Sequence, residues 1–237
     1  MKSRLFLLST VSALALAGNA FAADLPVKAP PQVVAAVTSW TGPYIGAHGG
    51  IGWLRAKQTV SDGVFACGLE GATCDVNTTG AVFGGQLGYN WQQREWVFGL
   101  EVDGSWTGLK ETKSFAPAFP HIKNEKIDWL ASARARLGWA MGDTLFYATG
   151  GVAFANFNAG WTQIGGGARF QLDTTTVGWV AGGGIERIFT RHWSARAEFL
   201  HYGLGKKTAT GVTPAGTYTT AFRHDVSVVR LGINFRP

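Results

Sequence analysis

The side chains in this sequence that could do chemistry are charged residues in segments where polar and apolar residues alternate. Four acids and four bases share this setting: Glu101, Asp103, Arg134, Arg136, Glu186, Arg196, Glu198 and Arg230. Residues two apart lie on the same face of a β-strand. Because an isolated buried charge is costly, charges of both signs that face one enclosed space must pair. The pattern predicts an ion-pair network with a structural role.

Other chemical constellations are weak. The five histidines, at 48, 121, 192, 201 and 224, show no metal-ligand spacing, and no Gly-x-Ser-x-Gly motif occurs. The glycine clusters are not followed by a helical pattern, which a phosphate-binding loop would need. We therefore expect no catalytic residues, no metal site and no cofactor.

The N-terminus has the features of a secretory signal peptide. Lys2 and Arg4 precede an apolar run over residues 5–17, and Ala20-Phe21-Ala22 resembles a cleavage site. This predicts a signal peptide over residues 1–22 and an exported mature chain. Residues 23–39 contain three prolines and are expected to form an extended periplasmic lead-in. In an exported protein, Cys67 and Cys74 are expected to form one small disulfide loop.

The composition indicates a β-protein with a lipid-facing surface. The chain has 33 glycines and 10 tryptophans, and only 15% of its residues are charged, against about 25% in typical soluble domains. The mature chain offers no run of about 20 apolar residues for a membrane helix. A closed barrel is the other structure that satisfies every backbone group in lipid. The net charge of +6 is spread along the chain, which disfavours a nucleic-acid partner.

Eight segments alternate with a period of two. They are residues 44–53, 81–91, 96–107, 127–139, 144–157, 176–188, 193–202 and 222–235. Short and long connections strictly alternate between them, which is typical of outer-membrane barrels and is not required in a soluble sandwich. Residues 40–237 are therefore predicted to form an all-β, eight-stranded antiparallel transmembrane β-barrel, with short periplasmic turns and four long external loops.

Tryptophans cluster near both ends of these segments. They are Trp53, Trp91, Trp96, Trp106, Trp129, Trp139 and Trp193. We expect them to form aromatic belts at the two membrane interfaces, although tryptophans of an ordinary core are the alternative.

The polar faces would meet in the narrow interior of the barrel. The expected pairs join neighbouring strands: Glu101 or Asp103 with Arg134 or Arg136, Glu186 or Glu198 with Arg196, and Arg230 with Glu198.

Several motifs resemble small porin-like outer-membrane proteins of alphaproteobacteria. They lie at residues 23–31, 40–46, 84–91, 98–101, 147–153, 182–186 and 229–235. The resemblance implies an OmpA-like barrel in the Gram-negative outer membrane, with lipid and lipopolysaccharide as its surroundings. Members are linked to envelope integrity and host contact, and some relatives bind hemin. The family usually ends on an aromatic residue that the barrel-assembly machinery reads; here Phe235 is followed by Arg236 and Pro237.

Three functions remain open at this point. The leading hypothesis is a non-enzymatic barrel that contributes to envelope integrity and surface contacts. The second is a porin for small solutes, in which the interior arginines would set a weak ion preference. The third is a surface protein that binds hemin or a host ligand at its loops, where His121 lies near Phe115 and Phe119.

Overall fold

A computed structural model describes residues 39–60, 73–115, 121–163, 169–213 and 216–237. The predicted signal peptide, almost all of the lead-in, and Cys67 lie outside the described residues. The strands are β1 (Gly42–Val60), β2 (Thr73–Gln93), β3 (Trp96–Phe115), β4 (His121–Met141), β5 (Thr144–Gln163), β6 (Arg169–Ile188), β7 (Trp193–Thr213) and β8 (Gly216–Phe235). No described helix is long and apolar enough to cross a membrane.

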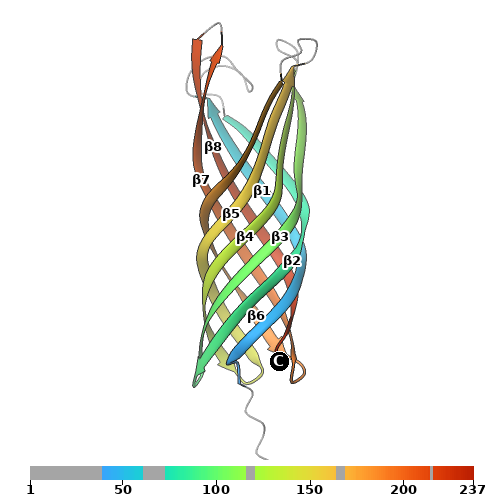
Figure 1. Cartoon of the computed structure of the whole chain (residues 1–237), viewed down its shortest axis with the longest axis vertical. Coiled ribbons are helices and arrows are strands. Elements are labelled where there is room, and N and C mark those ends of the chain that lie inside the picture. The colour runs from blue at the N-terminus through green and yellow to red at the C-terminus, as the bar shows by residue number, and fades with distance from the viewer. Residues whose placement is uncertain (1–38, 61–72, 116–120, 164–168, 214–215) are drawn as a thin grey trace, which may run out of the picture. The chain divides into compact units, whose positions relative to one another are not determined.

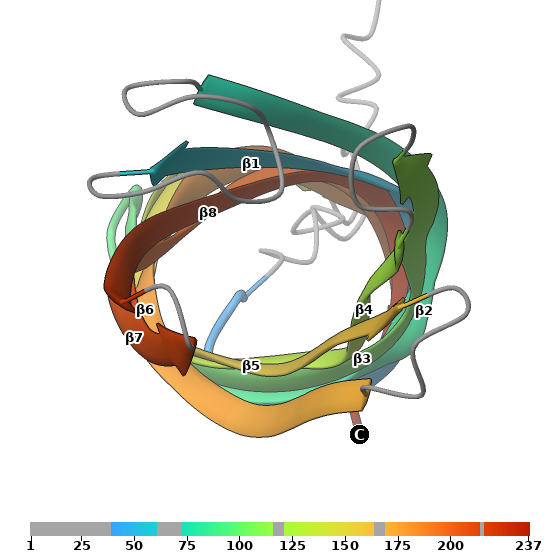
Figure 2. The ribbon, with the colours of Figure 1, turned by 90° about the horizontal axis from the view of Figure 1, so that it is seen from above.

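The eight strands form one closed antiparallel barrel (Figures 1 and 2). Each strand pairs with the next along the chain, and β1 pairs with β8 from Ile45↔Phe235 to Val60↔Thr220. The predicted eight-stranded antiparallel barrel is therefore confirmed. We call the end with the tight β2–β3, β4–β5 and β6–β7 connections the short-turn end, and the opposite end the hairpin end.

The period-two pattern separates an outer from an inner face, as β3 illustrates. Leu100 and Val102 are 58% and 52% exposed, whereas Glu101 and Asp103 are 4% and 7% exposed. Successive side chains of a strand point to opposite faces. The apolar positions of β3 thus face outward, where lipid is expected, and the charged positions face the barrel interior.

The strands extend further than the sequence pattern predicted. Each has 19 to 21 residues, whereas crossing a membrane takes only about 9–11. Phe115 and His121, which were expected in a loop, pair with each other at the ends of β3 and β4. Phe119 lies outside the described residues. Much of each predicted external loop is therefore a continued hairpin, because the strand ladder satisfies backbone groups that a loop would leave unpaired.

A bulge in β4 also corrects the predicted pattern. Strict alternation placed Asp128 on the inner face with Ser132 and Arg134. The register with β5 shifts between Ile127 and Leu130, so both of these apolar side chains are buried. Asp128 is instead partly exposed and forms an ion pair with Lys126. One extra residue in a strand reverses the face of everything beyond it.

Most of the predicted belt tryptophans lie on the outer face. Trp91, Trp96, Trp139 and Trp193 are exposed at the short-turn end, and the rings of Trp96 and Trp139 meet edge to face with centroids 5.0 Å apart. Towards the hairpin end, Trp106 is 64% exposed. Trp53 and Trp129 are only partly exposed. Trp179, which the predicted set omitted, is as prominent as these residues.

Leu100→Arg tests the outward face of β3. A charge placed there would enter the hydrocarbon, so we expect the variant to lose ~2–4 kcal/mol of unfolding free energy. The measurement is urea unfolding of protein refolded into lipid vesicles, followed by tryptophan fluorescence. Thr112→Arg, on the exposed extension of the same strand, is the control and should change stability by less than ~0.5 kcal/mol. Equal effects of the two substitutions would contradict the assigned lipid face.

Candidate functional site

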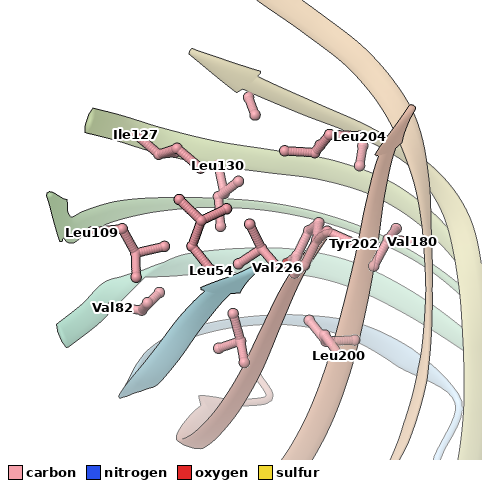
Figure 3. Close-up of a cluster of buried hydrophobic side chains, with 13 residues drawn as sticks. Leu54, Val82, Leu109, Ile127, Leu130, Val180, Leu200, Tyr202, Leu204 and Val226 are labelled. Atoms are coloured by element: carbon pink, nitrogen blue, oxygen red, sulfur yellow. The ribbon is translucent and has the colours of Figure 1, made fainter. Parts of the chain in front are cut away.

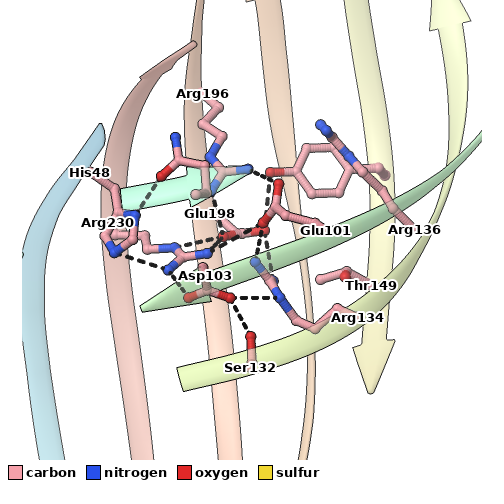
Figure 4. Close-up of polar contacts among 12 residues, drawn as sticks. His48, Glu101, Asp103, Ser132, Arg134, Arg136, Thr149, Arg196, Glu198 and Arg230 are labelled. Carbon is pink, nitrogen blue, oxygen red and sulfur yellow. Dashed lines mark hydrogen bonds and ion pairs between the residues drawn. The ribbon is translucent and has the colours of Figure 1, made fainter. Parts of the chain in front are cut away.

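The interior of the barrel is filled by three layers of side chains. At the short-turn end, an apolar layer consists of Trp40, Val97, Ala140, Leu145 and Tyr147. The middle layer contains the charged residues (Figure 4). Towards the hairpin end, a second apolar layer is drawn in Figure 3: Leu54, Val82, Leu109, Ile127, Leu130, Ala153, Ala155, Val180, Leu200, Tyr202, Leu204, Val226 and Val228. The sequence pattern placed the charged residues in the interior but did not predict this second apolar layer.

Arg134 and Arg230 form the centre of the charged layer. The Arg134 guanidinium contacts Glu101, lies 3.1 Å from Glu198 and lies 3.3 Å from Asp103. Arg230 Nη1 donates to Asp103 Oδ1 over 2.8 Å, and its Nη2 lies 2.7 Å from Glu198 Oε2. Both arginines therefore bridge the same acids from different strands.

Two further arginines extend the network. Arg196 Nη1 donates to Glu101 Oε2 over 2.5 Å, and Tyr44 donates its hydroxyl proton to the same oxygen over 2.6 Å. Arg136 binds Glu186 and stacks over the Tyr147 ring, with its guanidinium carbon 3.6 Å from the ring centroid. Ser194 and Asn234 donate to Glu186 Oε1 over 2.6 Å and 2.8 Å. Each buried carboxylate thus accepts several charge-assisted or neutral hydrogen bonds, which offset its desolvation.

The structure brings all eight predicted network residues into one cluster, but its contacts differ from simple neighbour pairing. Arg134 contacts Glu101 on the adjacent strand, and Arg230 contacts Glu198 across β7 and β8. Glu186 lies opposite Arg196 in register, yet it binds Arg136 from β4. Arg196 reaches across the interior to Glu101 on β3. These cross-barrel pairs form because an arginine side chain is long relative to an eight-stranded lumen.

Uncharged polar residues that were not predicted complete the middle layer. His48 Nδ1 donates to Gln86 Oε1 over 2.6 Å, and His48 Nε2 accepts from Ser105 over 2.8 Å. Nε2 also faces Arg230 Nη1 at 3.2 Å. These partners assign a neutral imidazole with its proton on Nδ1. The alternation of inward and outward positions could have predicted these residues, because His48 and Gln86 occupy inward positions of β1 and β2.

Glycines make room for the network on neighbouring strands. In register, Gly50 lies opposite Arg230 and Gly151 lies opposite Arg134. A Cβ atom on Gly151 would lie 2.0 Å from the Ala133 carbonyl oxygen and 2.7 Å from the Arg134 Cα. The same opposition recurs in four more pairs: Gly88 with Glu101, Gly99 with Arg136, Gly184 with Glu198, and Gly232 with Arg196. The sequence alone could not predict that glycines lie opposite charged residues, because this requires the register between neighbouring strands.

Trp40 and Arg236 close the short-turn end. The Trp40 backbone N–H donates to Gln92 Oε1 over 2.7 Å, and its indole N–H donates to the Gly142 carbonyl over 3.3 Å. Arg236 lies over the Trp40 ring, 5.1 Å from its centroid, and donates to the Ser39 carbonyl over 2.7 Å. Burial lowers the pKa of the Arg236 guanidinium. The residues just before β1 and just after β8 are therefore joined beneath the barrel.

The charged side chains of the interior are engaged with one another. Each of the eight predicted charges lies within ion-pair distance of an opposite charge. Among the described residues, no three histidine, cysteine, aspartate or glutamate side chains gather as they would around a metal ion. Cys67 lies outside the described part of the chain, so the predicted Cys67–Cys74 disulfide stays a prediction.

Comparison with known proteins identifies the family. Residues 6–235 match the outer membrane protein β-barrel domain, and the chain belongs to this family. It is 31% identical to the 31 kDa outer-membrane immunogenic protein of Brucella melitensis, over 97% of this chain and 98% of that protein. It is 28% identical to the 22 kDa outer membrane protein of Rhizobium leguminosarum, over 84% and 78% of the two chains. The protein is thus an outer-membrane β-barrel protein, as predicted.

Solved structures share the fold at low sequence identity. The outer membrane protein OprG from Pseudomonas aeruginosa matches with a TM-score of 0.50 and 10% identity, over 85% of this chain and all of that chain. The outer membrane protease OmpT from Escherichia coli matches with a TM-score of 0.53 and 8% identity, over 82% and 97% of the two chains. At these identities the similarity concerns the barrel fold alone.

A double-mutant cycle between Arg134 and Glu101 tests the network. Either alanine variant leaves a buried charge without a full set of partners, so each should lose ~3–5 kcal/mol of unfolding free energy. The double variant should be more stable than the sum predicts by more than ~1 kcal/mol. The exposed Lys126–Asp128 pair is the control, with a coupling below ~0.5 kcal/mol. Additive losses at Arg134 and Glu101, measured by urea unfolding in vesicles, would remove this pair from the network.

Two adjacent glycines of β5 test the requirement for room beside the arginines. Gly151→Ala forces a Cβ atom into the β4 backbone and should cost ~1–3 kcal/mol. A Cβ on Gly150 would meet only the Val180 carbonyl oxygen at an ordinary 3.6 Å, so Gly150→Ala should stay within ~0.5 kcal/mol of wild type. Unfolding midpoints of the two variants in the same vesicles provide the measurement. A cost at Gly150 equal to that at Gly151 would contradict the steric explanation.

Proposed function

We propose that this protein is a sealed, non-enzymatic barrel that contributes to the integrity of the outer membrane and to contacts at its surface. The filled interior is the observation that carries this proposal. A barrel whose lumen is occupied by its own side chains serves as a stable membrane element rather than a wide passage. Contacts with molecules outside the cell would then be made by residues at the hairpin end.

The charged layer and the two apolar layers oppose conduction for different reasons. The central arginines and carboxylates bind one another, and the side chain of Arg134 is fully buried. The apolar layers on both sides of them exclude water, and constrictions lined by apolar side chains block ions by dewetting. A solute would have to break the ion pairs and displace both apolar layers. The filled interior therefore disfavours the porin alternative.

The long hairpins support a role in surface contact. Their strands continue well past the length that a membrane requires, so they carry chain beyond the outer leaflet. The related Brucella proteins are named outer-membrane immunogenic proteins, which supports exposure of the corresponding surface in this chain. A host molecule or hemin would bind at this end, whereas lipid and lipopolysaccharide would surround the barrel. The barrel-assembly machinery would read Phe235, the last aromatic residue of β8.

Enzymatic activity is not part of the proposal. The protease named among the structural neighbours shares the fold at 8% identity, which transfers no active site. The interior acids of this chain are engaged by arginines, so none is positioned to activate water. The non-enzymatic assignment therefore rests on the paired state of the described carboxylates.

Planar-bilayer recording tests the sealed barrel. Folded wild-type protein, verified by its heat-modifiable gel mobility, should give no discrete conductance steps. Trp40→Ala opens the short-turn layer but leaves the two other layers in place, so it should remain silent too. Stable steps from the wild-type protein would establish an open lumen and support the porin alternative. A general porin from the same preparation protocol serves as the positive control.

A further inference from the structure

The barrel opens at two places near the hairpin end, where strand pairing stops before the strands do. Within the described residues, β6 and β7 pair from Ile188↔Ser194 only as far as Trp179↔Gly203. The pairing of β2 with β3 ends at Val82↔Thr107. All other neighbouring strands remain paired well beyond these levels. The eight strands therefore divide into two four-stranded sheets, β7-β8-β1-β2 and β3-β4-β5-β6. In Figure 1 the ends of β7 and β8 stand apart from those of β4 and β5.

Local backbone geometry explains the division at β6 and β7. The β7–β8 register shifts between Gly203 and Lys206, and Gly205 has a positive φ of 77°. This left-handed conformation is readily available only to glycine. A bulge bends its strand and increases its twist. Strand β7 thus turns away from β6 immediately above the exposed Trp179, which lies near the expected outer interface.

The two openings differ in whether a hydrogen bond links the strands beyond the last paired residues. Across β2 and β3, the Thr78 hydroxyl donates to the Lys110 carbonyl over 3.0 Å. This contact lies above the last paired residues and holds the two edges together. Across β6 and β7, a Cβ atom on Gly178, just beyond the last paired residue Trp179, would lie 2.3 Å from the Gly203 carbonyl oxygen. Between the described side chains of β6 and β7, no hydrogen bond bridges the strands above this point, so we take the β6 edge as the candidate for a partner strand.

The edge of β6 lacks the usual protection against strand addition. Exposed edges are commonly protected by lysines, prolines or bulges. Residues 169–178 of β6 contain no lysine and no proline, and they include the β-branched run Thr174-Thr175-Thr176-Val177. The Asp173 carboxylate accepts a hydrogen bond from Asn156 on β5 over 2.8 Å, so it is engaged within its own sheet. The facing segment of β7, residues 204–213, contains Lys206 and Lys207 and no acid.

We propose that the β6 edge over Arg169–Gly178 binds an extended, acidic peptide segment of a partner protein by β-strand addition. Main-chain hydrogen bonds to the unpaired edge would supply affinity, and side-chain chemistry would supply selectivity. Acidic side chains suit a strand that enters beside the basic β7 segment. The inference rests on the proposed function, since it specifies one kind of surface contact made by the sealed barrel.

The test uses the full mature chain refolded in nanodiscs and a fluorescent peptide of alternating threonine and glutamate. Anisotropy should show saturable binding, and hydrogen exchange should show new amide protection confined to residues 169–178. The same peptide with alternate amides N-methylated should bind at least ~10-fold more weakly, because it has lost edge hydrogen bonds. A threonine–lysine peptide should also bind more weakly. Equal binding of the N-methylated peptide, or protection elsewhere, would overturn the proposal.

Proline substitutions locate the edge. Alternate residues of β6 direct their N–H groups to β5 and to the open side, so Thr174→Pro and Thr175→Pro are made separately. The one that removes an edge N–H should weaken peptide binding ~10-fold. Thr112→Pro, on the edge of β3 at the other opening, is the matched control and should bind as wild type. Loss of binding in Thr112→Pro alone would exclude the β6 edge, and concentration-dependent dimers in place of peptide binding would overturn the proposed occupant.

Gel mobility shows whether each variant folds, and exchange protection of the membrane strands provides a second check. Conductance of the same samples separates the two proposals. Silent barrels that bind no peptide would overturn strand addition alone, whereas conducting barrels would overturn the sealed barrel whatever the peptide does.

Discussion

The closed ladder of backbone hydrogen bonds is the constraint on which the rest of this structure depends. In lipid no water is available to satisfy a free N–H or C=O group, so β1 must pair with β8. Eight strands closed in this way enclose a lumen only as wide as a few side chains. The interior residues are therefore forced into contact with one another. The charged layer, the apolar layers and the glycines opposite the arginines all follow from that narrowness.

Charge balance inside the lumen is the second consequence. Four arginines and four carboxylates share one layer, and Glu101, Asp103 and Glu198 each contact at least two arginines. Such a cluster gains little over a well-packed apolar interior, but it is strongly destabilised when one member is removed. The cluster links strands that are not neighbours in the barrel, because its ion pairs join β4 to β6 and β7, and β3 to β7 and β8. The apolar layers on either side exclude the water that would weaken these pairs.

At the hairpin end the backbone ladder does not have to close, and there the pairing between some neighbouring strands stops. Outside lipid, water can satisfy edge groups, so the ladder no longer has to close. The register shifts of β3–β4, β4–β5 and β7–β8 all lie near this level, and the barrel divides into two sheets above it. The same strands thus form a closed barrel over much of their length and two sheets with open edges towards the hairpin end. The hairpin end can therefore make surface contacts while the closed part of the barrel keeps its pairing.

Sequence alone determined the period of two, the eight segments, the tight turns and the identity of the inward charges. Each of these depends on residues close together in the chain, such as Glu101 and Asp103 on one strand face. Tertiary structure decided which arginine meets which acid, because Arg196 and Glu101 approach only across a closed lumen. It also decided the reversal at Asp128, the plug formed by Trp40, and the strand extensions in place of loops. A one-residue bulge or a cross-barrel contact leaves no periodic signal, since its energy comes from partners distant in sequence.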